Sequence, residues 1–184
     1  NKMFYASTYI NGILSGWDVS NVTNMSQMFD HANNFDNDSI SAWDVSKVVD
    51  MYRMFENCSY NKGGISSWNV GSCKNMKEMF IYSGSDGSKF THSLSGWGNS
   101  TSSVTSMERM FVNSVPFTGS VSGWDLRNVK TMYSMFENAD AFNQPLEWGN
   151  STTALLNINR LFYGVNVFNS SVSALDTRSV TGMN

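Results

Sequence analysis

The chain has 184 residues, of which 41% are hydrophobic and only 15% are charged, and its net charge is −3. This length suits one ordinary domain or a short repeat array rather than several large domains. The 12 Lys and Arg residues do not exceed the 15 Asp and Glu residues, so a nucleic-acid partner is not expected. No apolar run reaches the roughly 18 residues of a membrane span.

An internal repeat is the strongest signal in the sequence. Six tryptophans recur at intervals of 26, 25, 29, 27 and 24 residues, and Met-Phe or Leu-Phe pairs recur in step with them. The tryptophans are Trp17, Trp43, Trp68, Trp97, Trp124 and Trp148. In a further unit, Leu175 takes the tryptophan position. Because a unit of about 25 residues cannot bury its own apolar face, we expect successive units to stack around one continuous interior.

Taken in chain order, one unit predicts two short elements. Residues 40–45 place Trp43 and Val45 two positions apart, which is typical of a short strand. Residues 48–58 then carry apolar side chains at steps of three and four, which predicts a short helix or 3₁₀ segment. The predicted fold is therefore a leucine-rich-repeat-like solenoid with one parallel strand and one helical segment per coil. Residues 1–184 would form a single array of about six to seven coils, truncated or continuing at both ends.

The third unit contains an insertion, Ser83–Lys89, which adds Ser, Gly and Asp residues before Phe90. This composition predicts a surface loop. Two interpretations stay open, because such an insertion can mark a binding edge of a repeat array or can be a tolerated bulge.

The repeated phrase resembles the BspA-type leucine-rich-repeat surface proteins. The resemblance rests on the Trp-Asp-Val-Ser and Met-Phe pattern of Ser15–Phe29, on its repetition in Ser41–Phe55, and on the junction Ala141–Leu146. It implies a right-handed solenoid, an extracellular or cell-surface location, and a role in adhesion or surface assembly without catalysis. Gly98 and Gly149 depart from the pattern, because each replaces the Asp that follows Trp.

The residues that follow the tryptophans form a candidate interaction face. They are Asp18, Asp44, Asn69, Asp125 and Asp176. Carboxylates stacked on neighbouring strands would lie roughly 5 Å apart and repel each other, and cations or partner amines could relieve this repulsion. Alternatively, each carboxylate accepts hydrogen bonds from backbone N–H groups of the following turn.

No motif for a nucleophile, a phosphate or a zinc ion is found, and His31 and His92 lie in different coils without a partner at ligand spacing. We therefore expect neither an enzyme nor a cofactor nor a metal. Cys58 and Cys73 occupy opposite ends of the predicted helical segment, roughly 15 Å apart, which favours buried free thiols over a disulfide.

Asn-x-Ser/Thr sequons offer candidate glycosylation sites if the protein is secreted by a eukaryote. In another context the same residues would form turns or cap helices. The candidates are Asn21, Asn24, Asn37, Asn57, Asn99, Asn150 and Asn169.

Two functions follow as hypotheses. The first is a non-catalytic extracellular scaffold for adhesion or assembly, including a subunit of a filament or coat, whose partner is a second copy end to end or a neighbouring domain. The alternative is a lectin-like module that binds carbohydrate or protein through the flat strand face or the Ser83–Lys89 loop. Neither hypothesis involves nucleic acid or membrane insertion.

Overall fold

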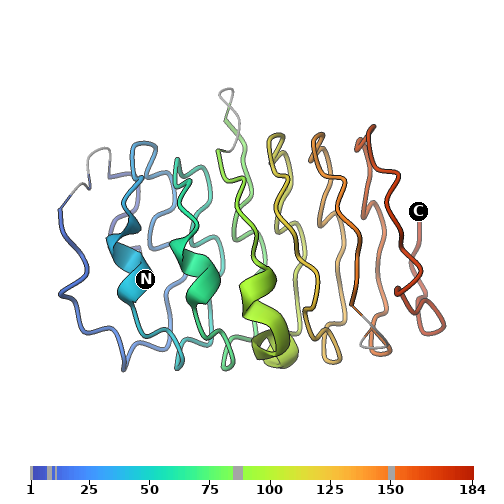
Figure 1. Ribbon diagram of the computed structural model, residues 1–184, viewed down its shortest axis with the longest axis horizontal. Coiled ribbons are helices and arrows are strands. Elements are labelled where there is room, and N and C mark those ends of the chain that lie inside the picture. The colour runs from blue at the N-terminus through green and yellow to red at the C-terminus, as the bar shows by residue number, and fades with distance from the viewer. Residues whose placement is uncertain (1, 8–9, 11, 85–88, 149–151) are drawn as a thin grey trace.

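The computed structural model describes residues 2–7, 10, 12–84, 89–148 and 152–184. Its coils follow one another along the long axis, from the blue N-terminal coil to the red C-terminal coil (Figure 1). Three 3₁₀ helices are present in the described residues: η1 (Asp38–Ala42), η2 (Gly64–Ser67) and η3 (Ser95–Ser103). Each of them directly precedes or contains a tryptophan.

The prediction of a strand-based leucine-rich-repeat solenoid is wrong. The β-type pairing between neighbouring coils is limited to isolated parallel bridges. The described residues therefore contain no named strand and no sheet. The predicted strand 40–45 begins inside η1, and the predicted helix 48–58 is a series of turns. The bridges join Asn24, Asp50, Asn75, Ser106, Thr131, Asn157 and Gly182 in succession.

Left-handed residues explain why the Met-Phe segment is not helical. Gln27 and His31 have φ angles of 55° and 57°, whereas a helix needs φ near −60°. The Met28 N–H closes a turn on the Met25 carbonyl, and the Gln27 N–H donates to Tyr52 of the next coil. Backbone N–H groups thus alternate between turns and the neighbouring coil. A left-handed non-glycine residue costs roughly 1–2 kcal/mol, which the bonds between coils offset.

The left-handed residues form two columns along the stack. The first column consists of Lys2, Gln27, Arg53, Glu78, Arg109, Ser134 and Arg160, and the second consists of Ala6, His31, Asn57, Asn113, Asn138 and Gly164. Asn adopts this conformation more readily than most residues, which accounts for its recurrence in the second column.

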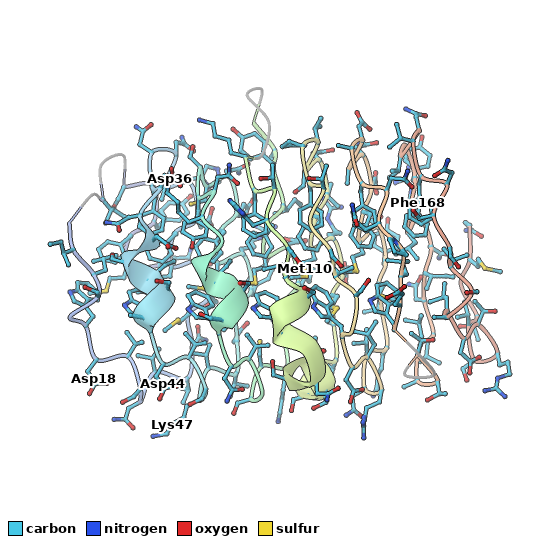
Figure 2. All side chains as sticks on the ribbon, viewed as in Figure 1. Asp18, Asp36, Asp44, Lys47, Met110 and Phe168 are labelled. Atoms are coloured by element: carbon cyan, nitrogen blue, oxygen red, sulfur yellow. The ribbon has the colours of Figure 1, made fainter. Side chains whose placement is uncertain are left out.

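A continuous stack of aromatic rings occupies the interior. One phenylalanine per coil faces its neighbours with ring centroids 5.5–5.8 Å apart and nearly parallel planes. These are Phe4, Phe29, Phe55, Phe80, Phe111, Phe136 and Phe162, which we call the phenylalanine column. A second row lies against it and includes Phe142 and Phe168. Met110 packs in the same interior (Figure 2).

The tryptophans lie in the core, as predicted, with Trp17 as the exception. Trp43, Trp68, Trp97, Trp124 and Trp148 are 1–4% exposed, whereas Trp17 is 37% exposed. Each buried indole N–H donates to a carbonyl of the preceding coil, for example Trp97 Nε1 to Ile65 O at 2.8 Å. That carbonyl also accepts the backbone N–H of Trp68, so both of its lone pairs are used. The sequence pattern gave no sign of this link between coils.

Cys58 and Cys73 are free and buried, in agreement with the prediction. Burial raises the pKa of each thiol to about 12. Both side chains therefore behave as small apolar groups rather than as nucleophiles.

Candidate functional site

The predicted interaction face is an edge of locally bonded side chains, which we call the acidic edge (Asp18, Asp44, Asn69, Asp125 and Asp176). Asp18 Oδ1 accepts the Ser20 N–H at 3.0 Å, and Asp44 Oδ1 accepts the Ser46 N–H at the same distance. The Ser20 hydroxyl and N–H lower the pKa of Asp18, and those of Ser46 lower the pKa of Asp44. The local hydrogen bonds that one of the two interpretations predicts are therefore present at Asp18 and Asp44.

Cations lie beside the acidic edge as well. Asp18, Asp44 and Lys47 lie on the lower edge of the molecule in Figure 2, and the Lys47 ammonium further lowers the pKa of both carboxyls. Hydrogen bonds from the Arg178 side chain and backbone lower the pKa of Asp176 to about 2. In the part of the chain that the structure describes, no three His, Cys, Asp or Glu residues are grouped to hold a metal ion.

A polar cavity of about 410 Å³ lies beside the Ser83–Lys89 loop and spans three coils. We call it the His31 cavity. The described residues that line it are His31, Asn33, Asn34, Asn57, Ser59, Tyr82, Ser83, Gly84 and Lys89. Residues 85–88 of the loop lie outside the described residues. A Cβ on Gly84 would lie only 2.9 Å from the Tyr82 ring, so a larger residue there would have to displace the phenol.

A chain of hydrogen bonds forms one wall of this cavity. The Ser83 N–H donates to Asn57 Oδ1 at 2.5 Å, and Asn57 Nδ2 lies 3.1 Å from His31 Nε2. His31 Nδ1 lies 2.5 Å from Asp30 Oδ1. Because a backbone N–H can only donate, Asn57 Nδ2 must donate to His31 Nε2, and His31 Nδ1 then donates to the Asp30 carboxylate. The two contacts therefore fit a His31 ring whose Nε2 accepts and whose Nδ1 donates.

The same chain continues into the C-terminal coils through a peptide group. Asn138 Nδ2 donates to Asn113 Oδ1 at 2.9 Å, and Asn113 Nδ2 donates to the Tyr82 carbonyl at 2.8 Å. The Tyr82 carbonyl and the Ser83 N–H belong to one peptide unit, which therefore takes the place of an Asn side chain. We call the whole series the amide ladder; it runs through Asn138, Asn113, the Tyr82–Ser83 peptide, Asn57, His31 and Asp30.

Buried charges lie behind the His31 end of the amide ladder. Asp30 is 1% exposed and also accepts a hydrogen bond from Gln27 Nε2 at 2.9 Å. Glu56 is buried, and this burial, followed by repulsion from Asp30, raises its pKa. Arg53 Nε lies 3.1 Å from Glu56 Oε2 and also pairs with Glu78 of the next coil. The sequence pattern indicated neither this group nor the amide ladder, because the contacts that complete them, such as Arg53 to Glu78 and Asn57 to His31, join different coils.

Two further depressions are present in the described residues. One of about 280 Å³ lies between Trp124 and Trp148, next to Asp125 and Arg127 of the acidic edge. The other, of about 470 Å³, is apolar and is lined by Phe162, Phe168 and their neighbours in the last coils. His92 contacts the Asn61 carbonyl at 3.1 Å and does not meet His31 in the His31 cavity.

The candidate glycosylation sites differ in exposure. Asn57 is 6% exposed and both ends of its amide are bonded, so a glycan is not compatible with its position. Asn37 caps η1 and donates to the Gly12 carbonyl at 2.8 Å. Asn150 lies outside the described residues. The exposed candidates are Asn21, Asn24, Asn99 and Asn169.

Comparison with known proteins places the repeat in a family. A family model described as "Mycoplasma protein of unknown function, DUF285" matches residues 1–102 and 81–184. The chain belongs to this family. The match supports a related repeat family but not the finer resemblance to BspA-type leucine-rich repeats. Neither a curated protein nor a solved structure matches the chain. Within the described ranges, no helix combines the length and apolar character needed to cross a membrane.

Proposed function

We propose that this chain is a non-catalytic repeat scaffold that acts in adhesion or assembly outside the cell or at its surface. The observation that carries the proposal is the phenylalanine column, which joins the coils through one uninterrupted interior. Since each coil is packed against its neighbours, the stack supports a stiff, elongated body rather than a hinged one.

The acidic edge is the surface that such a scaffold would present repeatedly. Its carboxylates are held in place by turn N–H groups, and Lys47, Arg127 and Arg178 lie among them. Opposite charges fixed at Asp18, Asp44, Asp125 and Asp176, with their neighbouring cations, can engage a partner at several points at once. Weak contacts of this kind gain strength through multivalency rather than through any single deep pocket.

The test of the scaffold uses beads coated with the purified chain and layered on cultured epithelial cells. We expect several-fold more adhesion than for beads coated with the core variant Trp97→Ala, which is expected to be largely unfolded. A triple variant removes the cations of the acidic edge and should lose adhesion: Lys47→Gln, Arg127→Gln and Arg178→Gln. The control variant Lys62→Gln removes a cation away from the acidic edge and should keep adhesion.

Assembly is measured in parallel by sedimentation velocity, from low micromolar protein to the highest soluble concentration. Concentration-dependent growth supports an assembling scaffold. A protein that adheres no better than its unfolded variant and stays monomeric throughout this range contradicts the proposal.

A second candidate function is carbohydrate binding, and the His31 cavity is the observation that favours it. The acidic edge offers locally satisfied carboxylates, whereas this cavity offers amides, hydroxyls and an aromatic ring around an open volume. A lectin-like role would therefore use the Ser83–Lys89 side of the molecule rather than the face that follows the tryptophans.

A further inference from the structure

The His31 cavity differs from the rest of the amide ladder in what surrounds it. In the C-terminal coils the ladder amides of Asn138 and Asn113 meet directly. At the third coil a peptide group replaces the side chain, and a cavity of about 410 Å³ lies beside Asn57, Ser83 and Lys89. This size lies within the range of small-molecule sites.

The chemistry of the lining favours a ligand rich in hydroxyl groups. The exposed amides of Asn33 and Asn34 can each donate and accept, and Lys89 can only donate. Tyr82 supplies the one aromatic ring among the described lining residues. A sugar hydroxyl both donates and accepts, so it matches such a mixed set, whereas an apolar ligand would find little surface here.

We propose that the His31 cavity binds a neutral mono- or disaccharide, with Asn33, Asn34 and Lys89 contacting its hydroxyls and the Asn57–Ser83 segment of the amide ladder forming the wall. This inference rests on the carbohydrate-binding role proposed above and names its site and ligand class. It is independent of adhesion through the acidic edge, which lies in a different part of the molecule.

Hydrogen bonds at both ends of the Asn57 amide fix the orientation of this wall. The Ser83 N–H donates to Asn57 Oδ1, so Asn57 Nδ2 faces His31 Nε2, and the amide cannot turn over without losing the bond from Ser83. The polar groups of the wall are therefore held in one arrangement toward the cavity.

The experiment is saturation-transfer NMR with the methyl glycosides of glucose, galactose, mannose and N-acetylglucosamine, and with lactose and cellobiose. At least one of these probes should receive saturation from the wild-type chain. The variant Asn57→Ala should weaken binding at least about tenfold.

The matched control is Asn138→Ala. Asn57 and Asn138 lie in the same left-handed column, with φ angles of 48° and 56°, and both belong to the amide ladder, but only Asn57 lines the cavity. Binding should therefore survive in Asn138→Ala. If Asn57→Ala does not fold, Lys89→Ala replaces it, with Lys62→Ala as its control, because Lys62 pairs with Asp36 outside the cavity.

The proposal is overturned if none of the saccharide probes receives saturation from the wild-type chain. It is also overturned if the cavity variant and its control lose saccharide binding to the same extent. If no probe binds while coated beads still adhere through the acidic edge, the saccharide site is lost and the scaffold proposal stands.

Discussion

The two ends of the amide ladder have the same backbone but different surroundings. At the C-terminal end, Asn138 donates directly to Asn113, and that amide donates to the Tyr82 carbonyl. At the N-terminal end, the chain passes from Ser83 through Asn57 and His31 to a buried carboxylate. The same repeat geometry therefore has two outcomes. Where asparagine side chains meet directly, it packs neighbouring coils together. Where the Tyr82–Ser83 peptide takes the place of an asparagine side chain, next to the insertion, a polar cavity is present.

The largest expected effects test whether one core underlies both regions. Trp68→Ala, on the cavity side, and Trp124→Ala, beyond it, should each lower the free energy of unfolding by about 3–5 kcal/mol, because both indoles are buried. Trp17→Ala should cost about 1 kcal/mol, since Trp17 is 37% exposed. Urea unfolding followed by circular dichroism measures all three. A much smaller loss for Trp68 would mean that the core is interrupted near the loop.

The next effect compares the two ends of the amide ladder directly. Asn57→Ala removes hydrogen bonds to both Ser83 and His31 and should cost about 2–3 kcal/mol. Asn138→Ala removes the bond to Asn113 and should cost about 1–2 kcal/mol. Denaturant midpoints give both values. A reversed order would show that the direct amide contacts, not the peptide link, carry most of the ladder's stabilisation.

A stabilising substitution is expected in the C-terminal region. Ser134 is left-handed, with a φ of 52°, and its buried hydroxyl has no hydrogen-bond partner. Ser134→Gly removes both costs and should raise the free energy of unfolding by about 1 kcal/mol. The control Ser114→Gly should lower it, because the Ser114 hydroxyl donates to the Phe80 carbonyl at 2.9 Å. Thermal melting of both variants shows whether each one is more or less stable than the wild-type chain. A Ser134→Gly variant that is less stable would contradict the claim that the left-handed backbone and the unbonded hydroxyl of Ser134 cost stability.

The smallest expected effect concerns Glu56 and depends on pH. Burial raises the pKa of Glu56 in the folded chain, so its ionisation above the unfolded pKa opposes folding, and protonation in acid removes that cost. Glu56→Gln should therefore stabilise the protein at neutral pH by up to about 1 kcal/mol and have little effect below about pH 4. Urea unfolding at both pH values measures this difference. Glu137→Gln, which loses a contact of 3.7 Å to Arg160, should give no such gain.

The sequence predicted the repeat and the residues of its interior, but not the local structure of each coil. The spacing of Met51, Met54 and Phe55 fits a helix, and only the stacked coils reveal that Arg53 between them is left-handed. Gly164 is the one glycine in the two left-handed columns of the described residues, because bonds to the next coil, rather than local preference, hold the backbone there. Trp43 and Val45 do face the core, but η1 precedes them instead of a strand.

The candidate site was less accessible to sequence reasoning than the core. The insertion was visible as Ser83–Lys89, and a binding edge was one of its two interpretations. The partners of His31 were not visible, because Asn57 lies a full coil away and Ser83 lies beyond that. Side chains that meet only through stacking have no signature at short sequence separation, and so the amide ladder could not be inferred from one coil.

The indole bonds that tie each coil to the one before it have a mechanical consequence. Each coil contacts only its two neighbours. A chain pulled at its two ends would therefore unfold one coil after another instead of unfolding in a single step. Each event would release about 25 residues, or roughly 85 Å of extended polypeptide. A tether of this kind lengthens in small increments under load, which would let it yield to shear while its remaining coils stay folded.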